Sequence, residues 1–434
     1  MSLFIKKIYK LGKNELFPIC RSITGNGVRK TLKIIKRHFS QLRIYEIQSG
    51  TKVFDWSIPA EWNVKDAYVI DKYNNKIINF KKNNLHLVGY STPINKVLKK
   101  KELFKHIHTL PKQQKAIPYI TSYYKKYWGF CISHLEKKLF EKKYKKNDNF
   151  RIVIKSNLKK NGSLTYGEIV IPGKSKKEIF ISTNICHPSM ANNELSGPMV
   201  SMCLIKYFQN YKNLEKTLRF IFIPETIGSL TYLSKNFKHL KKNVIGGYTL
   251  TCIGDEKQYS CMLTKYGNTV SDLAILDAFK KLNIKYKKYS FLKRGSDERQ
   301  YNSPGIDLPI ASIFKMKYGE YKEYHTSLDD FKLVTIKGIT QGFKVTKTAI
   351  EILLKKIIPI NNFLCEPHMS KRDLYPTLSG KFEHNYSISS RNLMNFLQYA
   401  DGKNDLSSIS RLIKLKYNET VKIYNLLVKH KLIN

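Results

Sequence analysis

Between residues 152 and 354, short apolar runs alternate with segments whose apolar residues recur at helical spacing. The runs RIVIKS, GEIVIPG, EIFISTNI, LRFIFIPE and GGYTLTCIG are rich in β-branched residues and bounded by turn residues, so they predict strands. The segments GPMVSMCLIKYFQNY and VSDLAILDAFKKL predict helices between them. This alternation predicts an α/β fold, with a mostly parallel sheet covered by helices on both faces. Binding sites in such sheets form beyond the carboxyl ends of the strands.

Two other parts of the chain have a different texture. Residues 51–127 contain short strand patterns interrupted by aromatic residues and prolines, which predicts a small inserted β-rich domain. The helical pattern VRKTLKIIKRHF precedes it, so we assign residues 1–50 and 128–365 to the α/β core. Residues 370–434 hold three helical patterns joined by short polar turns, which predicts a winged-helix-like C-terminal module.

Length and composition are those of a globular protein of two or three domains. The chain has 434 residues, of which 42% are hydrophobic and 25% charged. It contains no apolar run long enough for a membrane span or a signal peptide, so we expect a cytoplasmic protein with no membrane contact. The seven cysteines show no CxxC spacing and predict buried thiols in a reducing compartment.

The net charge of +44 comes from 77 Lys and Arg residues against 33 Asp and Glu residues. Such an excess can indicate a polyanionic partner. Here it is almost all lysine, is spread along the whole chain and accompanies abundant Asn, Ile and Tyr, which is typical of an AT-rich genome. We therefore do not expect nucleic acid as the partner, while a small anionic substrate stays compatible with the charge.

Four polar segments that follow or join the predicted strands hold candidate site residues. His187 ends one apolar strand, and its neutral imidazole is able to bind zinc, although a lone histidine is more often a packing residue. Glu225 directly follows another apolar strand, where it suits a metal ligand, a general base or a helix cap. Asp297 and Arg299 lie in a polar loop and are candidates for substrate binding or for supporting the ligands. His325 lies in a later polar loop beside carboxylates, an arrangement typical of zinc ligands.

The order of these residues resembles the zinc aminopeptidases with a phosphorylase/hydrolase-like α/β core, related to bacterial leucyl aminopeptidase. In that family a strand-end His, an Asp before a Ser-Gly helix start, a Glu after the next strand and a late His-Thr bind the metals. The matching positions here are His187, Asn193, Glu225 and His325. Longer motifs, including LFPICRSITGNGVRKTL, CHPSMANNELSG, PETIGS, RGSDERQY and YHTSLDD, resemble bacterial aminopeptidase-like proteins that carry a C-terminal winged helix. Members of that family often occur with polysaccharide-biosynthesis genes.

Three positions depart from the pattern that the resemblance implies. Asn193 stands where the family has a carboxylate that bridges two metals; its amide oxygen can bind zinc but brings no charge. Adjacent Glu194 is an alternative donor. Thr251 stands where aminopeptidases usually have another Asp, and the usual Glu-Glu pair is reduced to Glu225 alone. We therefore expect one zinc ion, not two.

The resemblance implies a zinc-dependent hydrolase that cleaves an amide bond in a peptide or an amino-sugar conjugate, with Glu225 as ligand or base. The departures favour an alternative, a degenerate relative that binds its ligand without cleaving it. A third hypothesis is a nucleic-acid-binding regulator acting through the C-terminal helices. The last helix also carries leucines that packing needs, and we favour docking to a protein partner as the use of this module.

Overall fold

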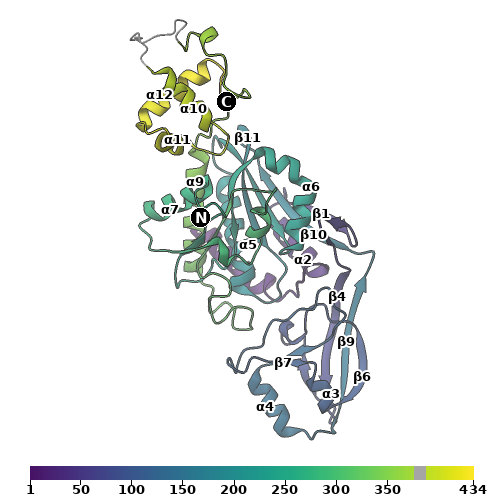
Figure 1. Cartoon of the computed structure of the whole chain (residues 1–434). Coiled ribbons are helices and arrows are strands. Elements are labelled where there is room, and N and C mark those ends of the chain that lie inside the picture. Colours follow the sequence, from purple (N-terminus) through teal and green to yellow (C-terminus); the bar gives the residue numbers. More distant parts are fainter. Residues whose placement is uncertain (376–387) are drawn as a thin grey trace.

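The computed structural model describes residues 1–375 and 388–434, and its largest element is a mixed sheet of eight strands in the order β1-β10-β12-β11-β13-β16-β14-β15 (Figure 1). The strands are Arg43–Gln48 (β1), Ser163–Ile171 (β10), Lys216–Ile223 (β12), Ser175–Asn184 (β11), Val244–Leu250 (β13), Ile310–Phe314 (β16), Ser260–Met262 (β14) and Lys287–Tyr289 (β15). The central strands β12, β11, β13 and β16 are parallel, and antiparallel strands flank them. The expected α/β class and helix-covered sheet are confirmed, with a mixed sheet around a parallel centre.

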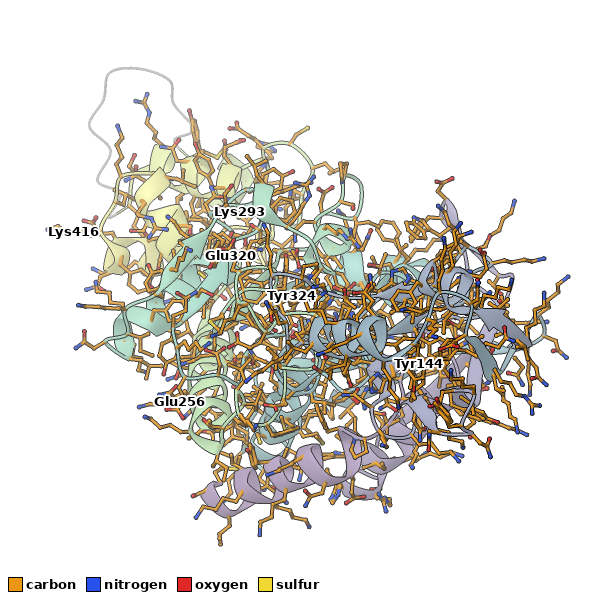
Figure 2. The ribbon with its side chains drawn as sticks, turned by 90° about the horizontal axis from the view of Figure 1, so that it is seen from below. Tyr144, Glu256, Lys293, Glu320, Tyr324 and Lys416 are labelled. Atoms are coloured by element: carbon orange, nitrogen blue, oxygen red, sulfur yellow. The ribbon has the colours of Figure 1, made fainter. Side chains whose placement is uncertain are left out.

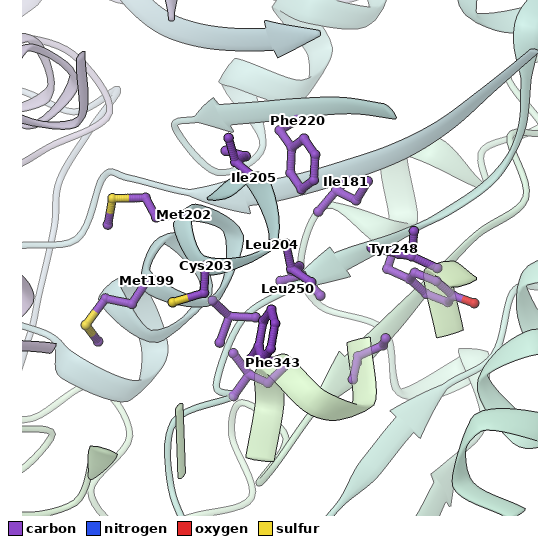
Figure 3. Close-up of a cluster of buried hydrophobic side chains, with 14 of the residues drawn as sticks. Ile181, Met199, Met202, Cys203, Leu204, Ile205, Phe220, Tyr248, Leu250 and Phe343 are labelled. Atoms are coloured by element: carbon purple, nitrogen blue, oxygen red, sulfur yellow. The ribbon is translucent and has the colours of Figure 1, made fainter. Parts of the chain in front are cut away.

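Helices cover both faces of this sheet because the central strands are apolar on both sides. One hydrophobic cluster joins the sheet to the helices Ser2–Leu11 (α1), Asn26–His38 (α2), Ser196–Phe208 (α5), Val270–Lys281 (α7) and Ile336–Lys355 (α9). Figure 3 shows its centre, where Met199 and Leu204 of α5 lie with Leu250 of β13 and Phe343 of α9. The other cluster includes residues of helix α6, Ile227–Asn243.

A second sheet of four strands, in the order β5-β4-β9-β6, extends away from the core at the lower end of Figure 1. Its strands are Lys76–Asn79 (β5), Glu61–Ile70 (β4), Asn149–Lys159 (β9) and Ile94–Lys99 (β6). The prediction that RIVIKS joins the main sheet is wrong, since β9 pairs with β4 and β6 instead. Sequence periodicity cannot show which sheet a strand joins, and the β-rich region therefore reaches past residue 127.

Shorter elements connect these layers. They are the strands Lys52–Val53 (β2), Trp56–Ser57 (β3), Ile107–His108 (β7) and Phe130–Cys131 (β8), the helices Lys100–Phe104 (α3), His134–Lys143 (α4) and Glu298–Tyr301 (α8), the π-helical turns Gly12–Leu16 (η1) and Ala191–Leu195 (η3), and the 3-10 turns Asn84–His86 (η2), Phe291–Lys293 (η4) and Ser370–Arg372 (η5). The turn η3 carries Asn193 and runs directly into α5, which fixes the loop that follows β11.

The C-terminal module contains the helices Ser390–Tyr399 (α10), Leu406–Leu412 (α11) and Tyr417–Lys429 (α12), packed around a hydrophobic cluster of their own. Isolated bridges join Ile360 to Asp401 and Asn361 to Ile433, so the connection from α9 takes part in the module. The module lies at the end of the core opposite to the four-stranded sheet (Figure 1). The three helices expected from the sequence are thus present.

Two smaller expectations have different outcomes. All seven cysteines are free, and most are buried as expected, but Cys20 is half-buried and Cys365 is exposed. Among the described residues, each helix falls short of the length and apolarity that crossing a membrane requires. Figure 2 shows long side chains with terminal nitrogens around the whole outline, in keeping with the even spread of lysines along the sequence.

Candidate metal centre

His187 and Glu225 meet because the strands that precede them are parallel neighbours. The last register pair of β11 and β12 joins Asn184 to Ile223, so both chains leave the sheet at the same edge. Nε2 of His187 lies 3.7 Å from Oε2 of Glu225. The imidazole of His325 arrives from the loop before α9, with its ring centroid 5.2 Å from that of His187. The structure therefore brings together three side chains that are far apart in the sequence.

The His187 imidazole is oriented by Glu194. One Glu194 oxygen accepts the His187 backbone N–H at 2.8 Å, and the other lies 2.7 Å from His187 Nδ1. Burial alone would lower the pKa of His187, but the neighbouring Cys186 and Glu194 raise it well above its ordinary value. The Cys186 thiol lies 3.5 Å from Nδ1, and burial raises its own pKa to about 12. This geometry leaves Nε2 of His187 as the atom that faces Glu225.

Glu225 is held by its own backbone and by Ser296. Its N–H donates to the Cys186 sulfur at 3.2 Å, and the Ser296 hydroxyl donates to its Oε1. Burial raises the pKa of Glu225, although His187 opposes this. Since Ser296 occupies Oε1, the oxygen turned toward His187 is Oε2, and the Glu225 side chain keeps 25% exposure toward solvent.

The His325 ring is enclosed by two tyrosines. Tyr324 stacks on it with ring centroids 3.9 Å apart, and Tyr119 meets it edge-on at 5.1 Å. Figure 2, seen from below, shows Tyr324 toward the middle of the projection, away from rim residues such as Lys416. His325 Nε2 is buried without a hydrogen-bond partner. Burial and the nearby His187 lower the pKa of His325 to about 3, so its imidazole is neutral and has a free lone pair.

The position where the family pattern has a bridging carboxylate is neutral. Asn193 is buried, its Oδ1 has no hydrogen-bond partner, and its backbone N–H donates to Asp329 at 2.9 Å. The Thr251 hydroxyl donates to the Asn193 carbonyl at 2.7 Å. Asp255, four residues beyond Thr251, accepts hydrogen bonds from Asn192 Nδ2 and from the Met316 N–H. In this half of the site, hydrogen bonds within the protein therefore engage Asp255, Thr251 and the Asn193 backbone, while Asn193 Oδ1 has no partner.

Asp297 and Arg299 both contact Thr226, the residue after Glu225. Asp297 is 1% exposed, and its Oδ1 accepts the Thr226 N–H at 2.7 Å and the Ser229 hydroxyl at 2.9 Å. Arg299 donates to the Thr226 hydroxyl at 2.6 Å. Thr226 has a φ of 62°, a left-handed conformation that is costly for a β-branched residue. Both side chains thus stabilise a strained turn that positions Glu225, and their contact with substrate stays a prediction.

Sequence reasoning passed over several residues that shape this site. Tyr119 lies edge-on to both imidazoles, Ser296 fixes Glu225, and buried Arg21 donates from Nε to the His187 carbonyl at 3.0 Å. Glu298 is 1% exposed and accepts a hydrogen bond from the Tyr318 hydroxyl. Arg21, Ser296 and Glu298 lie inside motifs that carried the family resemblance, which was the available signal.

His187 Nε2 and Glu225 Oε2 have the spacing of two ligands of one divalent cation, and the His325 ring lies beside them. Tetrahedral zinc with ligands at about 2.1 Å separates neighbouring ligand atoms by roughly 3.4 Å, close to the 3.7 Å between His187 Nε2 and Glu225 Oε2. The unpartnered nitrogen of His325 and the unpartnered Oδ1 of Asn193 are buried polar atoms that a bound ion would satisfy. A geometric group of Cys186, His187 and Glu194 also satisfies metal-ligand spacing, but His187 hydrogen bonds already engage both oxygens of Glu194.

Comparison with known proteins assigns the chain to a family. The profile of the domain of unknown function DUF4910 matches residues 9–356. The chain belongs to the DUF4910 family. A winged helix-turn-helix profile matches residues 357–434, so this DUF4910 chain carries a C-terminal winged helix, as the sequence predicted.

Two matches from Clostridium acetobutylicum extend over nearly the whole DUF4910 chain. A protein provisionally named a polysaccharide biosynthesis protein with aminopeptidase-like domain is 41% identical over 407 residues, 93% of this chain and 90% of the relative. A crystal structure provisionally named a peptidase has a TM-score of 0.79 and 38% identity, covering 100% of this chain and 97% of that one.

More distant structures share the fold of the DUF4910 chain. The zinc aminopeptidase BSAP from Bacillus subtilis has a TM-score of 0.60 at 14% identity, covering 82% of this chain and 95% of its own. A peptidase M28 precursor from Shewanella amazonensis has a TM-score of 0.56 at 10% identity, over 82% and 93% of the two chains. The α/β core is therefore aminopeptidase-like.

Proposed function

We propose that this protein is a zinc-dependent hydrolase of the aminopeptidase type, which cleaves an amide bond in a peptide or an amino-sugar conjugate. Its metal would be a single ion held by His187, Glu225 and His325, with Asn193 Oδ1 as a fourth, neutral donor. The observation that carries the proposal is the convergence of two imidazoles and one carboxylate at the carboxyl edge of the parallel strands.

The chain's own residues would prepare the reaction in three ways. Glu194 holds the His187 ring so that Nε2 faces the site, and Ser296 holds one oxygen of Glu225. Tyr119 and Tyr324 enclose His325 and limit the access of water. Zinc, when bound, would polarise the scissile carbonyl and make its water acidic. In our proposal Glu225 is a ligand through Oε2, while Ser296 donates to its Oε1.

Family names also support the substrate class. The Clostridium acetobutylicum relative is named for polysaccharide biosynthesis, which fits an amino-sugar conjugate as the substrate. The distant fold relatives are aminopeptidases, which fits a peptide. We propose that the winged helix at residues 357–434 serves as a docking module for a protein partner.

A catalytically degenerate binder is the second candidate, and the neutral Asn193 half of the site favours it. Asn193 supplies no charge, and the Thr251 hydroxyl is committed to the Asn193 carbonyl. Such a protein would bind an amide-containing ligand at the same place without turnover.

Metal analysis combined with substrate assays would test both candidates. We expect purified protein to hold one zinc ion and to hydrolyse aminoacyl-nitroanilides or N-acyl amino sugars. His187→Ala should lose both properties. The matched control is His239→Ala, which removes a histidine paired with Glu178 near the opposite end of β11. Stoichiometric zinc without turnover on either substrate class would favour the binder, and zinc content unaffected by His187→Ala would refute the metal site itself.

A further inference from the structure

A second hollow lies at the opposite edge of the main sheet, between the core and the C-terminal module. It has a volume of about 550 Å³ and is lined by the start of β11, the end of α6, the start of β13, the loops before α7 and β16, and the loop between α10 and α11 of the module. Lys177 lines it near the beginning of β11, whereas His187 follows the end of the same strand. A strand of ten residues spans roughly 30 Å, so this cleft is separate from the candidate metal centre.

Positive charge exceeds negative charge in this cleft. The charged residues of its wall are five lysines and two aspartates: Lys177, Lys241, Lys242, Lys265, Lys403, Asp307 and Asp401. Asp307 pairs with Lys265 and lies 3.8 Å from Lys241. The Asp401 carboxylate accepts the backbone N–H groups of Lys403 and Asn404. The ammonium groups of Lys177, Lys242 and Lys403 are therefore not matched by these two carboxylates.

The crowding of these lysines has an electrostatic cost. The Lys177 ammonium donates to the Lys242 carbonyl at 3.1 Å, which brings the two residues together. Burial lowers the pKa of Lys177, and the charge of Lys242 lowers it further. A bound anion would relieve the repulsion between these groups.

We propose that this cleft binds a small molecule bearing a phosphate or diphosphate group. Lysine is a point-charge partner for phosphate, and the excess of three lysines over the aspartates matches a diphosphate better than a single carboxylate. The volume of about 550 Å³ suits a small metabolite. The Tyr266 ring, 67% exposed on the cleft wall, offers a flat surface for a ring attached to the phosphate.

The ligand would join two parts of the chain. Lys403 and Asn404 belong to the module, whereas the other lysines of the cleft belong to the core. The module contacts the connection after α9 through the Ile360–Asp401 bridge and the hydrogen bond from Gly402 to the Pro359 carbonyl. An anion that contacts both walls would stabilise this arrangement, so ligand binding would control how the winged helix is held.

Calorimetric titration of the full chain with inorganic pyrophosphate tests the proposal. We expect one saturable site, weakened roughly tenfold in the double variant Lys177→Gln/Lys242→Gln. The control Lys138→Gln/Lys142→Gln removes the same charge from exposed positions of α4 and should leave the affinity unchanged. Thermal unfolding checks that each variant is folded.

A third variant distinguishes weaker binding from loss of structure. Lys403→Gln changes only the module wall and should weaken pyrophosphate several-fold without altering the core. Absence of saturable binding would overturn the proposal. So would binding to several sites that both double variants weaken equally, because that result would reflect the general excess of lysine.

Discussion

The two halves of the candidate metal centre differ in charge. On one side, His187, Glu225 and His325 present two imidazoles and a carboxylate, with Glu194 behind the first ring. On the other, Asn193 and Thr251 are neutral and bonded to each other through the Asn193 carbonyl. The charged half therefore holds the candidate donors for a metal ion, while hydrogen bonds hold the neutral half, around Asn193 and Thr251, together.

The largest expected effect is the loss of the charged half. We predict that His187→Ala lowers zinc affinity at least about hundredfold, because it removes a direct donor and leaves the buried Glu194 without its partner. Competition titration with a zinc chelator measures the affinity. Equal zinc affinity in the variant and the wild type would show that the charged half is not the metal site.

The next effect concerns the carboxylate behind His187. We predict that Glu194→Gln lowers zinc affinity about 10–100-fold, since the amide holds the His187 ring less firmly and carries no charge. Asp255→Asn is the matched control, because Asp255 is a buried carboxylate that bonds to Asn192 on the neutral half. The control should reduce stability but leave zinc affinity unchanged. Similar losses of zinc affinity in both variants would remove the distinction between the halves.

Restoring a charge should make the two halves more alike. We predict that Asn193→Asp raises zinc affinity about tenfold through the added negative charge, and lowers the melting temperature of the metal-free protein because that charge is buried. Asn192→Asp is the control, since its Oδ1 accepts the Gly254 N–H and its Nδ2 donates to Asp255. It should lose stability without gaining zinc affinity. The same change in zinc affinity in Asn193→Asp and Asn192→Asp would contradict the proposed difference between the two halves.

The smallest effect is a pH dependence of stability on the charged half. Burial and Glu225 raise the pKa of Asp297 from 3.8 to about 8. The folded protein therefore holds a proton that the unfolded chain releases near pH 4, and this contribution to stability is full below pH 4 and is lost as pH rises through 8. We predict that the metal-free protein loses roughly 2–4 °C more in melting temperature between pH 5 and pH 9 than Asp297→Asn does. Parallel pH profiles of the two proteins would show that Asp297 does not carry the effect.

The fold was largely accessible from the sequence because long apolar strands and amphipathic helices have strong local patterns. The sheet to which strand β9 belongs could not be predicted, because its sequence pattern fits either sheet. Its pairing with β4 and β6 in the structure places it in the four-stranded sheet. The candidate ligands His187, Glu225 and His325 were predicted from two strand ends and a later polar loop, and the structure brings them together. The role of Glu194 was not predicted, because it depends on the tight turn η3, which carries Glu194 back to His187 Nδ1.

The sequence also did not predict the supporting contacts made by distant segments. Arg21 meets the His187 carbonyl from 166 residues away, and Ser296 reaches Glu225 across 71 residues. No local pattern reports such a contact. The motifs that contain Arg21 and Ser296 indicated that these segments matter, but only the folded chain shows which atoms they hold.

The loop at residues 116–121 pairs with the loop that carries His325. Pro118 bridges to Thr326, the Tyr119 N–H donates to the His325 carbonyl at 2.9 Å, and Ile117 and Ser327 exchange hydrogen bonds. The left-handed backbone of His325, with a φ of 52°, is thus braced from a region outside the main sheet. During folding, the third ligand would reach its place only after these two loops have docked. Zinc capture would then report the last step of assembly, and an early intermediate with only the main sheet formed would bind the ion weakly.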